Sequence, residues 1–246
     1  MLFSQSVTVL RQFEHGKKTW RTILPLVKTQ TTGSEESGLV YCPRYGTRGD
    51  CLISFSGYCD NMDECGYLKE LNIFDMDTRE WRTIRYNKES DNQVPQARSK
   101  CSMIYIAQRN QVVMYGGKTD DAQLYDLWTL DLRDFSWKQV THAVTGDAPK
   151  RKWMNMQLNS MIVVASSDET TEKLLLYMLD GETLHWTSYR TPLNYRLHFL
   201  SLHQFEENEE ANTADSSRMV LFAKYKSTDY HIYLIETNTP VLMQKL

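Results

Sequence analysis

Basic residues recur near the starts of predicted strands, and they offer the most informative chemistry in this chain. They form three clusters, which follow or lie close to Pro95, Pro149 and Pro192. The clusters hold Arg98 and Lys100, then Lys150, Arg151 and Lys152, and then Arg190 and Arg196. A guanidinium group can bind a carboxylate or phosphate through two parallel hydrogen bonds, so arginines brought to one point would form an anion-binding site.

Two interpretations of Arg98, Arg151 and Arg196 stay open from the sequence. In the first, the three guanidinium groups converge and bind an anionic group of a partner, which would relieve the repulsion between them. In the second, each arginine caps backbone carbonyls or pairs with an aspartate nearby. Trp153 has two interpretations as well, core packing or an aromatic anchor on a binding surface.

Catalytic and metal-binding patterns are missing from the sequence. His198 and His203 fall on one predicted strand at an odd spacing, which points them to opposite faces. Cys59 and Cys65 are six positions apart, unlike the spacings that present two thiolates to one zinc ion. No serine-hydrolase elbow, phosphate-binding glycine loop or His-Glu-x-x-His motif occurs. We therefore expect a protein that is not an enzyme and has no cofactor and no metal site.

Charge and composition argue against several classes of partner and indicate a location for the protein. The 246 residues carry a net charge of −3, whereas nucleic-acid and polybasic membrane surfaces need a basic excess. The longest apolar runs, such as 160–165 and 219–223, are too short to span a bilayer. Five cysteines are an odd number in a chain large enough to have its own core, which favours reduced thiols. The expected location is the cytoplasm, with the nucleus as an alternative.

A tryptophan recurs with an acidic residue six positions before it, and this period predicts the architecture. The acidic positions are separated by 61, 56, 49 and 56 residues, which is the period of propeller blades. In the last copy a leucine replaces the tryptophan. The pairs are Glu14/Trp20, Asp75/Trp81, Asp131/Trp137, Asp180/Trp186 and Glu236/Leu242.

The third repeat shows the expected unit most clearly. Two glycines, Gly116 and Gly117, suit a turn with positive φ, and Trp137 suits a wedge between neighbouring blades. Four antiparallel strands are predicted for this unit, over Cys101–Ala107, Val112–Tyr115, Leu124–Leu132 and Trp137–Val140.

This pattern of an apolar strand, Gly-Gly, an aromatic and acidic strand and then a tryptophan resembles a kelch repeat. The other repeats depart from it, with Ser56-Gly57, Ala165-Ser166 and Ala223-Lys224 in place of the glycines. The resemblance implies an all-β, kelch-type β-propeller of four-stranded antiparallel blades. The expected units are a partial blade at 1–27 and blades at about 34–90, 95–145, 149–191 and 195–246.

About four and a half blades imply an incomplete or open ring. Only 13 residues precede Glu14, so in the first blade we expect a third strand, Ser6–Glu14, and an edge strand, Arg21–Leu26, without the two inner strands. Three explanations are open: a fragment or alternative product of a longer protein, an open arc, or a ring completed by another chain. We favour the first, because an open arc would leave an apolar edge unpaired.

Similarity to kelch proteins also implies a function. In such propellers the loops between blades emerge on one face, where Arg98, Arg151 and Arg196 would converge. Kelch adaptors of ubiquitin ligases use basic residues there to hold acidic motifs or a C-terminal carboxylate, so we expect a protein or peptide partner of that kind and cullin-ligase subunits. This chain departs from those adaptors in having no recognisable BTB segment, F-box or cullin-recruiting box. A cytoskeletal or trafficking scaffold is the alternative, and a degenerate propeller enzyme a further one.

Overall fold

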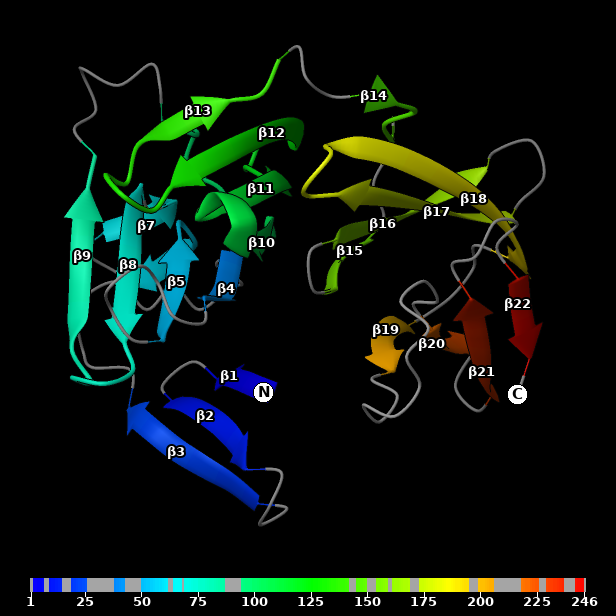
Figure 1. Cartoon of the computed structure of the whole chain (residues 1–246), viewed down its shortest axis with the longest axis horizontal. Helices are drawn as coiled ribbons and strands as arrows, with labels where there is room; N and C mark the ends of the chain where they lie inside the picture. The colour runs from blue at the N-terminus through cyan, green and yellow to red at the C-terminus, as the bar shows by residue number, and fades with distance from the viewer. Residues whose placement is uncertain are drawn as a thin grey trace. The chain divides into compact units, whose positions relative to one another are not determined.

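The structure is a computed structural model, and nearly all of its regular elements are β-strands (Figure 1). The exception in the described part of the chain is a short 3-10 helix, η1 (Ala107–Arg109). Two compact units are present, residues 1–103 with 107–139 and residues 104–106 with 140–246. The structure describes residues 2–6, 9–14, 19–25, 38–42, 50–61, 64–67, 69–86, 94–141, 145–149, 154–158, 161–168, 173–194, 199–205, 218–225, 229–236 and 242–245.

The N-terminal sheet has three strands where we expected two. Its order is β1 (Leu2–Ser6), β2 (Val9–Glu14) and β3 (Thr19–Pro25). The sequence predicts one strand over Ser6–Glu14, but Ser6 pairs with Val9 across an antiparallel ladder. The two residues between them, Val-Thr, are not of the types that usually mark a hairpin turn, so the sequence does not predict that one strand ends at Ser6 and the next begins at Val9.

The second repeat forms the expected four-stranded sheet and carries an additional hairpin. The second strand of the sheet, β5 (Cys51–Phe55), is mostly buried, whereas the fourth strand, β9 (Trp81–Arg85), is mostly exposed. The hairpin of β6 (Tyr58–Asn61) and β7 (Glu64–Tyr67) lies between the second and third strands of the sheet in the sequence. The sheet order is β4 (Gly38–Cys42), β5 (Cys51–Phe55), β8 (Glu70–Asp75) and β9 (Trp81–Arg85).

The third repeat confirms the prediction of four antiparallel strands in sequence order. Its inner strands are almost wholly buried, while the outermost strand exposes two of its three residues. Strands covered on both faces read as continuous apolar runs, as the 102–106 segment does. The strands are β10 (Ser102–Ile106), β11 (Gln111–Lys118), β12 (Gln123–Asp131) and β13 (Trp137–Gln139).

The fourth and fifth repeats have the same sequential order. In the fourth sheet an additional short strand, β14 (Thr145–Gly146), pairs in parallel with the outer strand. The other strands of that sheet are β15 (Met154–Leu158), β16 (Met161–Asp168), β17 (Lys173–Asp180) and β18 (His185–Asn194). The fifth sheet consists of β19 (Phe199–Phe205), β20 (Arg218–Tyr225), β21 (Asp229–Glu236) and β22 (Leu242–Lys245).

In the second, third and fourth repeats, the aspartate of the acid–tryptophan pair initiates the turn into the fourth strand. Asp75 Oδ1 accepts hydrogen bonds from the backbone N–H groups of Asp77 and Thr78, both at 2.9 Å. Asp131 Oδ1 accepts one from Arg133 N at 2.9 Å, and Asp180 Oδ1 accepts one from Thr183 N at 2.9 Å. A short carboxylate that bonds backbone two or three residues ahead stabilises such turns.

Each of these turns closes in the same way four residues after the aspartate. Arg79, Phe135 and Leu184 have φ values of 61°, 60° and 57°. Their N–H groups donate to the backbone carbonyls of Asp75, Asp131 and Asp180 at 2.9, 2.8 and 2.8 Å. The constant length of this turn fixes the tryptophan two residues later, at the start of the fourth strand or one residue into it, which explains the six-residue spacing.

Trp137 is the wedge between the second and third repeats, as predicted. Its side chain is 4% exposed, and its ring centroid lies 4.7 Å from that of Phe55 in β5. The indole Nε1 donates to Tyr86 Oη at 3.1 Å, and Tyr86 Oη donates to the carbonyl of Phe135 at 3.1 Å.

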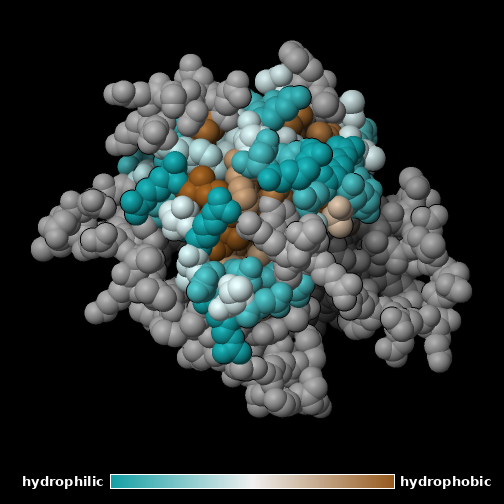
Figure 2. All heavy atoms as spheres, turned by 60° about the vertical axis from the view of Figure 1, so that its left-hand side comes forward, coloured by the Kyte–Doolittle hydropathy of each residue, from teal (hydrophilic) through white to brown (hydrophobic). Residues whose placement is uncertain are grey.

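On the face drawn in Figure 2, hydrophilic residues cover most of the described surface and hydrophobic residues show between them.

Candidate functional site

The segment that precedes β10 holds the second and third repeats together through its backbone. Arg98 N donates to Ser56 Oγ at 2.6 Å, and Gly57 N donates to the carbonyl of Arg98 at 2.9 Å. Ser99 and Lys118 then exchange two backbone hydrogen bonds, at 2.8 and 3.0 Å. Both ends of this short segment are therefore fixed, one to each repeat.

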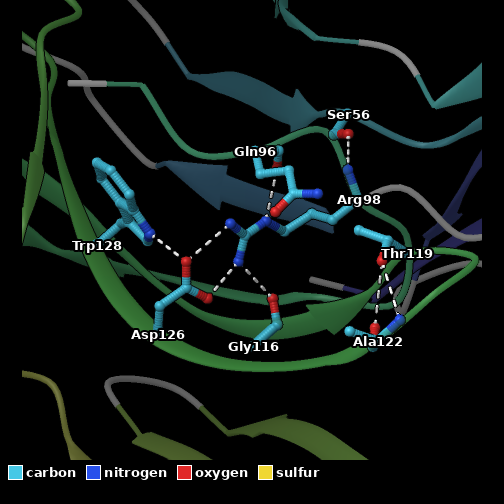
Figure 3. A network of polar contacts seen from close by, with 8 residues as sticks. All are labelled: Ser56, Gln96, Arg98, Gly116, Thr119, Ala122, Asp126 and Trp128. Carbon is cyan, nitrogen blue, oxygen red and sulfur yellow. Dashed lines mark hydrogen bonds and ion pairs between the residues drawn. The ribbon is translucent and has the colours of Figure 1, made fainter. Parts of the chain in front are cut away.

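The side chain of Arg98 is fully buried and uses its donors inside the protein (Figure 3). It pairs with Asp126 of β12 through two hydrogen bonds, Nη1 to Oδ1 at 2.5 Å and Nη2 to Oδ2 at 2.8 Å. Nη1 also donates to the carbonyl of Gly116 at 3.0 Å, and Nε donates to the carbonyl of Gln96 at 2.8 Å. The carboxylate of Asp126 further accepts a hydrogen bond from Trp128 Nε1 at 2.6 Å.

The electrostatics of this network favour the charged pair. Burial alone raises the pKa of Asp126, but the hydrogen bonds and positive charge of Arg98, with the Trp128 hydrogen bond, outweigh it and lower the pKa below its usual range. Bidentate guanidinium–carboxylate pairs combine charge with fixed geometry. The network therefore fixes the orientation of the Arg98 guanidinium group.

This arrangement corresponds to the second interpretation of Arg98. We expected its guanidinium group at the surface of a binding face, but it is 0% exposed and is paired with an aspartate and two carbonyls. A ligand carboxylate would have to displace Asp126 to reach it. We therefore reassign Arg98 from contacting a partner to positioning the segment between the two repeats.

Lys100 is placed differently. Its side chain is exposed, two residues beyond the buried arginine, and its φ of 57° lies in the left-handed region. Such a conformation costs free energy in a residue other than glycine and persists where the surrounding structure imposes it. Here the Arg98 network and the Ser99–Lys118 bridge fix the chain on its N-terminal side.

Other predicted site residues lie outside the part of the chain that the structure describes. They are Arg151, Lys152, Trp153 and Arg196. The convergence of Arg151 and Arg196 at one face stays a prediction.

The loop between β11 and β12 adds charge at the same end of the third repeat. Its tight turn is closed by Thr119 N to the Ala122 carbonyl at 2.9 Å and by Ala122 N to Thr119 Oγ1 at 3.1 Å. Asp120 and Asp121 are exposed, and Asp120 Oδ1 accepts a hydrogen bond from Tyr67 Oη of the β6–β7 hairpin at 3.3 Å. This loop thus contacts the second repeat as well.

Sequence reasoning missed Asp126 and Tyr125. Tyr125, 40% exposed, is the large hydrophobic side chain most open to solvent among the described residues. Asp126 lies between Tyr125 and Leu127 on a strand. A buried arginine needs a carboxylate partner, which would point to Asp126 if the burial of Arg98 were known. Nothing in the sequence shows that Arg98 is buried, so the sequence does not predict this pair.

Among the described residues, no group of three or more histidine, cysteine or acidic side chains is placed to hold a metal ion. The ring of His185 shares a 2.7 Å hydrogen bond with Thr145 Oγ1, which ties β14 to β18. No helix in this part of the chain is long and apolar enough to cross a membrane.

Comparison with known proteins agrees with the repeat geometry. A search of curated proteins found no match. A family model, the KLHDC2/KLHL20/DRC7 Kelch-repeats domain, matches residues 35–239, which is most of the chain. Kelch-repeats domains are modules for interaction with other proteins, and the four-stranded sheets with their shared turn fit that family. The chain therefore belongs to the KLHDC2/KLHL20/DRC7 Kelch-repeats domain family.

Proposed function

We propose that this chain recognises an acidic group or C-terminal carboxylate of a partner protein and serves as the substrate-recognition part of a ubiquitin-ligase adaptor, without catalysis of its own. The family supports a role in protein interaction. The recognition of acidic groups rests on the basic residues between repeats. We place the protein in the cytoplasm, with the nucleus as the alternative, because five cysteines are an odd number in a chain large enough to have its own core, which favours reduced thiols.

The observation that carries this proposal is the fixed position of Lys100 beside a charged loop. The buried Arg98 network anchors the chain two residues before Lys100, so the ammonium group starts from an ordered backbone. An ordered site loses less conformational entropy when a partner binds. Exposed charge on a rigid scaffold is the arrangement that recognition requires.

The residues proposed to contact the partner are Lys100, Arg151, Lys152, Trp153 and Arg196. An arginine–carboxylate contact that is shielded from water contributes about 1.5–3 kcal/mol. The exposed Asp120 and Asp121 would repel a partner that is acidic throughout and favour a local anion in a mixed or basic context.

The test is charge reversal at the proposed contacts, read by peptide binding. Arg151→Glu should weaken binding of an acidic C-terminal peptide, selected from a library on the wild-type chain, by more than tenfold and leave the melting temperature unchanged. Lys100→Glu should weaken it less, because an ammonium group binds as a point charge. Lys138→Glu is the matched control, since Lys138 is exposed on the outer strand β13.

The alternative gives the opposite result. If these residues serve stability alone, Arg151→Glu will lower the melting temperature and leave peptide binding intact. Affinity purification of the wild-type chain followed by mass spectrometry addresses the ligase role: cullin-ligase subunits would support it, and cytoskeletal or trafficking proteins in their place would favour a scaffold.

A further inference from the structure

Two of the buried cysteines lie directly opposite each other on neighbouring strands. Cys42 ends β4 and Cys51 begins β5, and they are register partners in the antiparallel ladder. Their exposed fractions are 0% and 3%. Both are in the thiol form, and their side chains hydrogen-bond to each other.

This placement matches the geometry that a disulfide needs. Directly opposite residues of antiparallel strands project from the same face, with Cα atoms about 4.5 or 5.5 Å apart depending on the type of pair. Disulfides accept Cα separations of about 4.4–6.8 Å. The two sulfur atoms can therefore be joined without a change of strand register.

We propose that Cys42 and Cys51 form a redox-active dithiol, which takes a low-molecular-weight disulfide such as oxidised glutathione as its oxidant and closes a cross-strand disulfide. This inference concerns the second repeat and does not depend on the proposed binding of acidic groups.

The reaction proceeds by two thiol–disulfide exchanges. One cysteine, as thiolate, attacks a sulfur of oxidised glutathione, which forms a mixed disulfide and releases one glutathione thiolate. The second cysteine, as thiolate, attacks the protein sulfur of that mixed disulfide and releases the other glutathione. Two protein thiols are oxidised and one glutathione disulfide is reduced to two thiols, which take up the two protons that the cysteines lose.

The fold determines how fast this exchange can occur. Burial, and after it the hydrogen bond and charge of Cys51, raise the pKa of the Cys42 thiol well above its usual range, which disfavours the reactive thiolate. In the described part of the chain β4 is an edge strand with β5 as its neighbour in the sheet. Local opening of β4 would expose both thiols together, so the site should respond to sustained oxidation and to conditions that loosen this edge.

The consequence of oxidation is a covalent link between an edge strand and the rest of its sheet. The link joins positions nine residues apart in the sequence. Reduced glutathione would reverse it, so the state of β4 would follow the thiol–disulfide balance of the compartment.

The experiment uses the full chain with Cys59→Ser and Cys65→Ser, since those cysteines share a tryptic peptide with Cys51. The protein is equilibrated over a series of oxidised to reduced glutathione ratios, blocked with an alkylating reagent and digested. Trypsin cleaves after Arg44 and Arg48, so a Cys42–Cys51 disulfide appears as two linked peptides. We expect two fewer alkylated cysteines per chain, the linked peptides, and their loss on return to reduced glutathione.

Two variants provide the controls. Cys51→Ala should abolish the linked peptides, whereas Cys101→Ala should retain them, because Cys101 is a buried thiol of the third repeat. If Cys51→Ala does not fold, fragmentation of the linked peptides from the chain that retains Cys51 identifies the same bond. Hydrogen exchange should show slower opening of β4 in the oxidised chain.

Three outcomes would overturn the proposal. The first is a chain that keeps both thiols at the most oxidising ratio even in denaturant just below the unfolding transition. The second is glutathione that remains attached to one cysteine with no linked peptides. The third is a disulfide that forms only in the unfolded chain and prevents refolding.

Discussion

The third and fourth repeats differ where the second strand of each sheet approaches its end. In the third repeat Gly116 and Gly117 have φ values of 66° and 113°, and the register with β12 shifts between Tyr115 and Gly117. In the fourth repeat Ala165 and Ser166 continue β16 without a break and pair in register with Leu176 and Leu175. The third repeat therefore contains a bulge that the fourth does not share.

The second repeat shows what this bulge provides. Ser56 and Gly57 have φ values of 60° and 123°, close to those of Gly116 and Gly117, although the first glycine is replaced. In both repeats the segment containing Arg98 bonds to this position, to Ser56 and Gly57 on one side and to the Gly116 carbonyl on the other. The backbone conformation is thus what joins neighbouring repeats, and one glycine is enough for it.

The largest effect should come from a feature that both repeats share. Trp137→Ala removes a ring that is 4% exposed and packs on Phe55, so we expect a loss of about 3–5 kcal/mol in the free energy of unfolding. Trp186, 2% exposed at the equivalent place in the fourth repeat, should behave alike. Denaturant titration measures both. An unchanged unfolding midpoint for Trp137→Ala would show that the assigned repeat phase is wrong.

The next effect should come from the junction between the second and third repeats. Arg98→Ala leaves the carboxylate of Asp126 without its buried partner, and we expect a loss of about 3 kcal/mol, at the low end for broken buried pairs. The low end applies because Asp126 is 23% exposed and keeps the Trp128 hydrogen bond. Thermal and denaturant unfolding report the loss.

A double variant separates the pair from its parts. Arg98→Met with Asp126→Leu removes both charges and should recover much of the stability lost by Arg98→Ala. Equal losses in the single and double variants would mean that the carbonyl contacts of Arg98, and not its charge, hold the repeats together.

A smaller effect should come from the bulge itself. A Cβ atom at Gly117 would lie 2.8 Å from the Ser99 carbonyl oxygen and 3.1 Å from Arg98 Cδ, and its φ of 113° is strained for other residues. Gly117→Ala should therefore cost about 1–3 kcal/mol. Gly116→Ser should cost less, because Ser56 adopts a similar φ in the second repeat. If the two substitutions cost the same, the close approach of Ser99 is not what requires glycine.

The strand order and the repeat phase follow from the sequence because both depend on local features. The aspartate turn is a contact between residues two to four apart, so its spacing to the tryptophan repeats along the chain. The hairpin of β6 and β7 was not predicted, since its sequence is polar and its strands have four residues each.

The candidate site was predicted only in part, for a different reason. Arg98 and Lys100 are both basic and lie two residues apart, yet one is fully buried and the other exposed. The difference depends on Asp126, which is 28 residues away, and on the carbonyls of Gln96 and Gly116. Sequence identifies the arginine as a residue that needs an anion, but the fold decides whether that anion belongs to a partner or to the protein.

The smallest effect should be a change in how stability depends on pH. The pKa of Asp126 is lowered in the folded protein, while an aspartate in the unfolded chain titrates near about 3.9. The stability that this carboxylate contributes is thus fully present above that value and is lost as the pH falls through the folded pKa. One titrating group changes the free energy of unfolding by at most about 1.4 kcal/mol per pH unit.

The Arg98→Met, Asp126→Leu variant isolates this contribution. Asp131, whose pKa the Arg133 hydrogen bond lowers to about 2, titrates in both proteins and cancels in the comparison. Below about pH 4 the free energy of unfolding of the wild type should therefore fall more steeply than that of the double variant, as measured by denaturant titration at a series of pH values. Parallel curves would mean that the Asp126 carboxylate has the same pKa in the folded and unfolded chain. The buried pair would then add no pH-dependent stability at the junction between the second and third repeats.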